Sequence, residues 1–286
     1  MVPDKNLTDA EFIGLRDFIY KKTGIFFTER NRFLLDARIR EILHQTGCKD
    51  ALTYLKSLSD PGASPVEVSR LINKVTITET SFFRDAHQIV AMSRNVIPEI
   101  AKRHEQLGAR LITIWSAGSS SGEEAYTLAI LLAEHFKGDL PKWNITIFAT
   151  DINDEALQMC KAGVYKSYSL RNTPPAIRDT YFQAMPDDRY VVRDDLKRLV
   201  MPQKSNLMDY SGSKRYTGAD LILLRNVMIY FEAGAKAQVL QMCYENLREN
   251  GYLFLGQSET AFGISHALKL VTFVNAFAYK KVPPLR

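Results

Sequence analysis

The stretch IWSAGSSSGEEAYTLAI (Ile114–Ile130) decides how this chain folds. It begins with apolar residues typical of a buried strand, passes through the small residues 117–122, and continues as a helical pattern behind two glutamates. Gly118 and Gly122 let the backbone approach a ligand closely, because they carry no side chain. A strand, a tight turn and a helix start in this order predict an α/β fold with a ligand at the turn.

From residue 110 onward, predicted strands and helices alternate. The strands are continuous, β-branched apolar runs, as in a parallel sheet covered on both faces. A final hairpin within Leu268–Lys281 should add an antiparallel strand. Where the alternation lapses, two strand-like pieces around residues 193–195 predict a small antiparallel β-subdomain inserted at about 164–205. Strands are expected at 110–117, 143–151, 220–227 and 252–258, and helices at 123–136, 154–162 and 235–249.

The first part of the chain, residues 1–75, reads as an all-α domain of four helices. Thr8 and Glu11 form a capping box at the start of the first helix, and Gly24 ends it. Gly47 ends the second helix in the same way. The predicted organisation is therefore a helical domain at 1–75, a linker at 76–92 and an α/β domain at 93–286.

The composition excludes several classes of protein, but it does not indicate one function. The net charge of +5 could attract nucleic acid, lipid or an acidic protein, and it is too small to decide among them. No apolar run approaches the roughly 18 residues of a membrane span, and the first residues do not form a secretory signal. The three cysteines lie far apart and match neither a zinc site nor a disulfide framework. We expect a cytoplasmic protein without membrane insertion.

The turn itself favours a cationic ligand. Its spacing is G-x-x-x-G, which is neither the dinucleotide fingerprint nor a phosphate-binding loop. Glu123 and Glu124 in the first helical turn would repel a phosphate and attract an ammonium group. The alternative is that both glutamates only complement the helix dipole.

Two further strand ends carry polar residues at the same predicted edge of the sheet. Asp151 follows ITIFAT and could accept both hydroxyls of a ribose, as in many nucleotide-binding folds. It could instead cap the next helix, a role that Asn153 could also fill. Arg225 and Asn226 end the apolar run LILL, and packing alone does not explain them.

An ordered set of motifs extends over nearly the whole chain: TETSFFRD, WSAGSSSGEEAYTLAI, FATDIN, SNL, RNVMIYF and LFLGQSE. This set resembles the chemotaxis receptor methyltransferases, the CheR-type enzymes that act on methyl-accepting chemotaxis proteins. The resemblance implies a helical, receptor-docking domain, a linker that reaches the active site, and a Rossmann-like methyltransferase domain with an inserted β-subdomain. It implies transfer of a methyl group from S-adenosylmethionine to receptor glutamates, with S-adenosylhomocysteine as product and no metal.

The resemblance also implies roles for individual residues. Glu124 would bind the amino group of the cofactor's methionine part, and Asp151 its ribose. Arg84 and Tyr230 would flank the transfer centre, where the glutamate is already ionised and needs no strong general base. Arg84 is also expected to bind the cofactor, and the other expected cofactor-binding residues are Thr78, Thr80, Asn206, Leu207, Leu224 and Arg225.

The chain departs from the family pattern at three places. Thr78 stands where members commonly have Asn, and Ala125 replaces the usual Pro. The segment YFQAMPDDRYVV lacks the glycine-rich loop of members that dock on a receptor pentapeptide, so we expect a member that does not need this tether.

The helical domain carries an excess of basic residues, +4 over residues 15–49. A solvated helical face would explain them. Docking of an acidic receptor helix is the alternative, since opposite charges speed and orient an encounter. The expected docking face consists of Arg30, Arg32, Arg38 and Arg40.

Other functions remain open from sequence alone. An NAD(P)-dependent oxidoreductase could use a similar sheet, although the dinucleotide fingerprint is absent and the terminal hairpin argues against it. A non-catalytic receptor-docking or signalling module of the same fold would show the same motifs without turnover. Methylation of nucleic acid is not favoured, because its Pro-Pro-Tyr or Pro-Cys signatures are missing.

Overall fold

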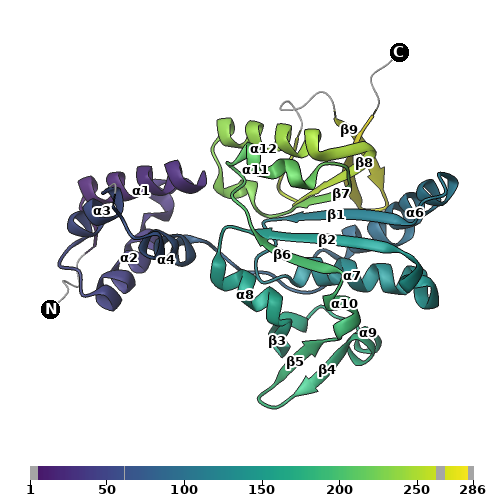
Figure 1. Ribbon diagram of the computed structural model, residues 1–286. Coiled ribbons are helices and arrows are strands. Elements are labelled where there is room, and N and C mark those ends of the chain that lie inside the picture. Colours follow the sequence, from purple (N-terminus) through teal and green to yellow (C-terminus); the bar gives the residue numbers. More distant parts are fainter. Residues whose placement is uncertain (1–5, 61, 262–267, 283–286) are drawn as a thin grey trace.

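The computed structural model describes residues 6–60, 62–261 and 268–282. Figure 1 shows a helical domain at one end, a central sheet covered by helices, and a small sheet that projects from it. The central sheet is parallel apart from its last two strands. These features confirm the predicted α/β class with an N-terminal all-α domain.

The N-terminal domain has its own hydrophobic core, formed where four short helices meet. The capping box is present: the Thr8 hydroxyl accepts from the Glu11 N–H, and the Glu11 carboxylate accepts from the Thr8 N–H. Gly24 and Gly47 end their helices with φ of 76° and 68°, in the left-handed region that favours glycine. The helices are α1 (Asp9–Thr23), α2 (Arg32–Thr46), α3 (Ala51–Ser59) and α4 (Pro65–Val75).

The central sheet has the strand order β6-β2-β1-β7-β8-β10-β9. Strand β1 pairs in parallel with β2 on one side and β7 on the other. The predicted terminal hairpin is confirmed as β9 and β10, which are antiparallel to each other, with β10 antiparallel to β8. The strands are β1 (Leu111–Ala117), β2 (Asn144–Asp151), β6 (Val200–Lys204), β7 (Ala219–Leu224), β8 (Leu247–Leu255), β9 (Leu268–Phe273) and β10 (Ala276–Lys281).

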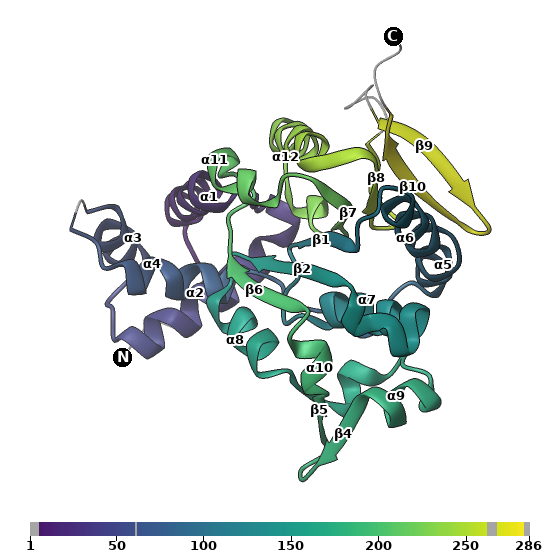
Figure 2. The same cartoon turned by 45° about the vertical axis from the view of Figure 1, so that its right-hand side comes forward.

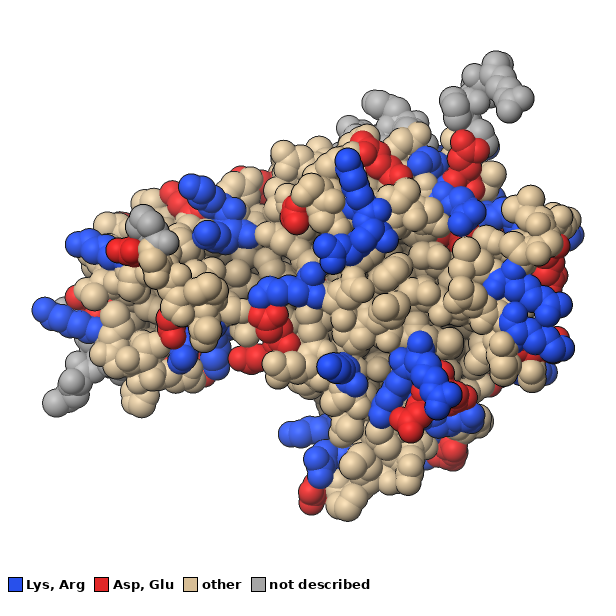
Figure 3. Space-filling view, in the orientation of Figure 1, with Lys and Arg blue, Asp and Glu red and all other residues tan. Residues whose placement is uncertain are grey.

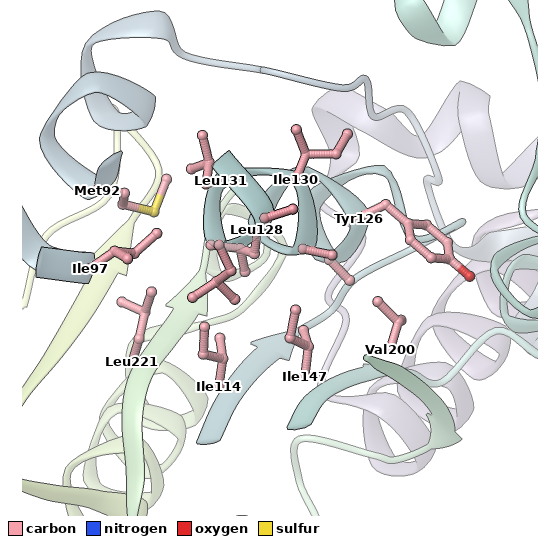
Figure 4. Packing of buried hydrophobic residues seen from close by; sticks show 14 of the residues in the cluster. Met92, Ile97, Ile114, Tyr126, Leu128, Ile130, Leu131, Ile147, Val200 and Leu221 are labelled. Atoms are coloured by element: carbon pink, nitrogen blue, oxygen red, sulfur yellow. The ribbon is translucent and has the colours of Figure 1, made fainter. Parts of the chain in front are cut away.

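Helices cover both faces of this sheet, so each face has its own core. Figure 4 shows Leu128 and Leu131 of α7 above the sheet residues Ile114 and Leu221. Trp115, the neighbour of Ile114, points to the opposite core, as alternation along a strand requires. Figure 2 separates the helices of the two faces. They are α5 (Ala86–Ala91), α6 (Ile97–Gln106) and α7 (Glu123–Phe136) on one face and α12 (Ala233–Asn246) on the other.

The inserted subdomain is shorter than the predicted 164–205. Its three strands are antiparallel in the order β3-β5-β4. The run Val200–Lys204 does not belong to it, because it pairs in parallel with β2 as an edge strand of the central sheet. The local sequence pattern of such a short strand does not indicate which sheet it joins, so the predicted boundary was wrong. The strands of the small sheet are β3 (Val164–Lys166), β4 (Phe182–Met185) and β5 (Arg189–Val192).

The linker is also shorter than the predicted 76–92. Only residues 76–85 lack regular structure, and α5 begins at Ala86. Ala91 and Met92 are buried in the core between the helices and the sheet, so this part belongs to the α/β domain. The helix continues through a π-helical turn at Met92–Val96 into α6.

A buried carboxylate anchors the start of β7. Asp220 is fully buried, and it accepts from Arg103 Nη2 at 2.8 Å and from the Thr113 N–H at 3.1 Å. His104 Nε2 lies 2.8 Å and Arg248 Nε 3.2 Å from the same carboxylate. This cluster ties α6, β1 and β8 to β7 at the end of the sheet opposite the predicted ligand site.

We expect Asp220→Ala to lower the free energy of unfolding by about 3–5 kcal/mol, because it removes the fully buried carboxylate that all the donors of this cluster share. Urea denaturation followed by circular dichroism would measure this loss. The matched control is Asp179→Ala, which breaks only an exposed pair with Arg178 and should cost less than about 1 kcal/mol. Equal losses in the two variants would contradict a structural role for the cluster.

Candidate active site

A cleft lies where the carboxyl ends of β1, β2 and β7 meet the linker and the helical domain. The strand register explains why these ends coincide: Ala117 pairs with Thr150, and Ser116 with Leu223. The cleft measures about 1300 Å³, part of it open to solvent. Eight of the predicted site residues line it: Thr80, Arg84, Glu124, Asp151, Asn206, Leu207, Arg225 and Tyr230.

Two predicted cofactor-binding residues do not line the cleft. Leu224 is fully buried in the core on the α12 side, whereas its neighbours Leu223 and Arg225 line the cleft. This follows from the pleat of β7, which turns alternate side chains to opposite faces. The Thr78 side chain is exposed, and the carbonyl of this residue accepts from Ser120 Oγ at 2.9 Å.

The small-residue turn packs tightly against its surroundings. A Cβ on Gly118 would lie 2.5 Å from Val227 Cγ2, and one on Gly122 would lie 2.3 Å from Cys160 Sγ. Both glycines have positive φ, so any larger residue would be strained as well as crowded. Its N–H groups are used within the protein: those of Gly118 and Ser119 donate to the Thr150 carbonyl, and that of Gly122 donates to the Ser119 carbonyl.

Asp151 is held by the backbone of this turn. Its carboxylate accepts from the Ser120 N–H at 2.8 Å and from the Asn153 N–H at 2.9 Å. Burial raises the pKa of Asp151, while the N–H groups act to lower it. The structure assigns the helix cap to Asn153, whose side chain accepts from the Ala156 N–H at the start of α8 (Asp154–Ala162). Asp151 keeps free lone pairs toward the cleft, which suits a ligand with paired hydroxyls.

Glu124 and Asp85 share one buried arginine. Arg225 Nη1 donates to Glu124 at 3.0 Å, and Nη2 donates to Asp85 and to the Arg84 carbonyl. Ser116 Oγ donates to the other oxygen of Glu124 at 2.7 Å. Two carboxylates and one guanidinium leave a local charge of −1, so this floor of the cleft favours a cationic group.

Some buried polar atoms at the cleft have no protein partner. Among the described residues, these include Ser119 Oγ and Arg225 Nε, and both residues line the cleft. Buried polar atoms in proteins are normally hydrogen-bonded. Together with Asp151 and the anionic floor, they fit a nucleoside that carries an amino acid, such as S-adenosylmethionine.

Glu123 behaves differently from its neighbour Glu124. It is 2% exposed, and its carboxylate accepts from Ser121 Oγ at 2.7 Å and Ser169 Oγ at 3.0 Å. Burial raises the pKa of Glu123. Because Ser169 belongs to the insertion, Glu123 joins the turn to that segment, and only Glu124 of the pair faces the cleft.

The mouth of the cleft is cationic. Arg84 Nη1 donates to the Glu79 carbonyl at 3.2 Å, and Arg38 of α2 donates to the Val75 carbonyl. Both guanidinium groups act to lower the pKa of Tyr230, but burial outweighs them and raises it. Tyr230 is therefore a neutral hydroxyl at neutral pH and can donate a hydrogen bond, whereas it is poorly suited to act as a base.

The four arginines predicted to form a docking face do not lie together. Arg38 donates to the carbonyl of Val75, which lines the cleft, whereas Arg32 donates to the Leu7 carbonyl and Arg40 to Asn6 Oδ1. Residues two apart on a helix point in directions about 200° apart, which separates Arg38 from Arg40. Arg30 is exposed just before α2. Figure 3 shows that cations and anions alternate over the visible face of the helical domain.

Sequence reasoning missed several residues that hold the site in place. Asp85 and Ser116 lay inside quoted motifs but were given no role. Glu259 follows β8 and is 6% exposed, and its carboxylate accepts from the N–H groups of Asn226, Ile229 and Gly256 at 2.8, 3.1 and 2.7 Å. The rule that polar residues gather after parallel strands could have pointed to Glu259 within LFLGQSE.

Neither a metal-binding cluster nor a membrane-spanning helix is found among the described residues. In the ranges 6–60, 62–261 and 268–282, no group of three or more His, Cys, Asp or Glu is placed to hold a metal ion. Over the same ranges, no helix has the length and hydropathy needed to cross a membrane.

We expect Glu259→Gln to lower the free energy of unfolding by about 1–3 kcal/mol. An amide has one acceptor oxygen, so it leaves at least one of the three backbone N–H groups facing its own NH₂. Urea denaturation would measure the change, with the exposed Glu249→Gln as control. A loss no larger than that of the control would show that the carboxylate does not hold this turn.

Comparison with known proteins agrees with this geometry. A chemotaxis protein methyltransferase 2 of Vibrio cholerae is 33% identical over 96% of this chain and 94% of its own length. Chemotaxis protein methyltransferases of Borreliella burgdorferi and Pseudomonas aeruginosa are 31% and 29% identical over 96% and 95% of this chain, covering 95% and 98% of theirs. Residues 78–276 match "CheR methyltransferase, SAM binding domain", and residues 10–76 match "CheR methyltransferase, all-alpha domain". The chain therefore belongs to the CheR methyltransferase family.

Proposed function

We propose that this protein transfers a methyl group from S-adenosylmethionine to the side-chain carboxylates of specific glutamates on chemotaxis receptors. The observation that carries the proposal is one cleft with an anionic floor at Asp151 and Glu124 and with Arg84 and Tyr230 in its lining, where Arg38 lies close enough to act on Tyr230. The relatives named above are chemotaxis protein methyltransferases, which supports a role in chemotactic adaptation. The products would be glutamate methyl esters and S-adenosylhomocysteine.

The floor residues would bind the cofactor. Asp151 would accept the ribose hydroxyls, and Glu124 the amino group of the methionine part. Arg225 would keep Glu124 oriented through their ion pair at 3.0 Å. Thr80, Asn206 and Leu207 would line the rest of the pocket. When bound, S-adenosylmethionine supplies an electrophilic methyl group on a sulfonium.

The mouth residues would orient the substrate. A glutamate side chain has a reference pKa of about 4.3, so it arrives as the ionised nucleophile. Arg84 and Arg38 would attract this carboxylate, and the neutral hydroxyl of Tyr230 would donate a hydrogen bond to it. No residue needs to remove a proton. Catalysis would come from alignment of the reacting atoms and exclusion of water.

The substrate would be an acidic cytoplasmic helix of a receptor, met by the helical domain. Arg30 and Arg38 would meet it, whereas Arg32 pairs with Asp9 and Glu29. The β4–β5 turn consists of Pro186, Asp187 and Asp188, without a glycine-rich loop. We infer that docking is independent of a receptor pentapeptide and takes place in the cytoplasm.

Incubation with methyl-labelled S-adenosylmethionine and receptor cytoplasmic domains tests the reaction. We expect label on receptor glutamates that mild alkali releases, because carboxylate methyl esters hydrolyse readily. A receptor whose methylated glutamates are replaced by alanine is the control and should stay unlabelled. Label that resists alkali would contradict esterification, and absence of any label would favour a non-catalytic docking module.

Binding of S-adenosylhomocysteine tests the floor of the cleft. We expect Asp151→Asn to weaken binding about 10- to 100-fold in calorimetry, the loss typical of a charged hydrogen bond. Since burial raises the pKa of Asp151, the wild-type affinity should fall as pH is lowered through this raised pKa, where the carboxylate takes up a proton. Asp151→Asn should lose this pH dependence.

The control for this measurement is Asp154→Asn, which changes a nearby carboxylate that pairs with Lys204 outside the cleft. Its affinity should match that of the wild type. Unchanged affinity in Asp151→Asn would remove Asp151 from the binding site.

A further inference from the structure

The loop after α1 reaches across the domain boundary to the turn that carries Tyr230. The Phe26 N–H donates to the Tyr230 carbonyl at 3.0 Å, and Ile25 forms an isolated antiparallel bridge with Phe231. Asn206 Nδ2 donates to the Lys22 carbonyl at 2.8 Å. The end of the first helix of one domain therefore touches two segments of the other.

Gly24 lets this approach take place. It has φ of 76°, and a Cβ on it would lie 2.8 Å from Met208 Sδ and 2.9 Å from Met208 Cγ. Gly47 ends α2 with nearly the same backbone, φ of 68°, but a Cβ there would meet nothing within 4 Å. The two glycines share the conformational requirement, and only Gly24 has the close interdomain contact.

The Tyr230 turn is held on its other side by the α/β domain. Glu259 accepts from the N–H groups of Asn226 and Ile229, and the Tyr230 N–H donates to the Val227 carbonyl within the turn. The Tyr230 carbonyl accepts its hydrogen bond from the Phe26 N–H of the helical domain. Arg38 of the helical domain also lies close enough to influence the pKa of the Tyr230 hydroxyl.

We propose that Gly24 and Phe26 are positioning residues for methyl transfer, because docking of the α1–α2 loop sets where Tyr230 stands in the cleft. The helical domain then contributes to the chemical step in addition to meeting the receptor. This inference rests on the proposed role of Tyr230 in orienting the substrate carboxylate. It predicts that disturbing the loop lowers turnover while the cofactor-binding floor, built on β1, β2 and β7, is retained.

The test compares Gly24→Ala with Gly47→Ala in the full-length protein. Both variants place alanine in a left-handed backbone, so both should lower the melting temperature, and Gly24→Ala should lower it more because its Cβ also crowds Met208. Only Gly24→Ala should lower kcat, by about 10- to 100-fold, since small misplacements of an orienting group have effects of this size. Its affinity for S-adenosylhomocysteine should fall by less than kcat does, because the crowded Met208 adjoins only Leu207 of the pocket and the carboxylates of Asp151 and Glu124 lie on other elements.

Two further measurements make the result specific. Hydrogen–deuterium exchange should increase at residues 226–231 in Gly24→Ala and not in Gly47→Ala. Adding Met208→Ala to Gly24→Ala removes the crowded Sδ and Cγ atoms and should restore much of kcat relative to Met208→Ala alone.

The outcomes separate this inference from the proposed function. If the wild type methylates receptors but Gly24→Ala keeps the kcat of Gly47→Ala, the positioning role is overturned and the function stands. Tyr230→Phe with wild-type kcat would overturn it too. Equal losses of kcat and of cofactor affinity in Gly24→Ala would also overturn it, since the loop would then affect the cofactor-binding residues and not the position of Tyr230. Absence of base-labile label with the wild type would overturn the function itself.

Discussion

One buried guanidinium joins the parts of this cleft. Arg225 is held between Glu124 of α7 and Asp85 at the end of the linker, and it also donates to the Arg84 carbonyl. Removing one partner from a buried ion pair typically costs about 3–5 kcal/mol, because a charge is left uncompensated. The strand end, the helix start and the linker are thus fixed relative to one another by a single side chain, which also leaves one negative charge for a ligand.

The cleft has negatively charged groups at its floor and positively charged groups at its mouth. Its floor has the carboxylates of Glu124 and Asp151, whereas at its mouth the guanidinium group of Arg84 lies in the lining and that of Arg38 acts on Tyr230. A cationic ligand is favoured at the floor and an anionic side chain at the mouth, so the two reactants of the proposed reaction would be drawn to different places. Because Phe26 and Leu34 of the helical domain line the cleft, its wall is complete only when both domains meet.

Sequence patterns predicted the elements well and the pairings between them less well. Capping and periodicity placed the helix at Asp154–Ala162 correctly, because these signals are local. The rule for parallel strand ends brought Glu124, Asp151 and Arg225 to one edge, as the structure has it. Which sheet a short strand joins depends on residues that are far away in the sequence. For this reason β6 was predicted in the inserted subdomain, whereas it belongs to the central sheet. For the same reason, sequence patterns did not predict the roles of Glu259 and Asp85. These roles depend on hydrogen-bond and ion-pair partners that are far away in the sequence.

The contact between Phe26 and Tyr230 joins residues that are 230 − 26 = 204 positions apart. During synthesis from the N-terminus, at roughly 5–20 residues per second, the second partner emerges about 10–40 s after the first. The helical domain has its own core and can fold during this interval. The transfer centre, in contrast, must await β8 and Glu259, which come still later. An unfinished chain on the ribosome can therefore present a folded helical domain before the cleft between the two domains exists.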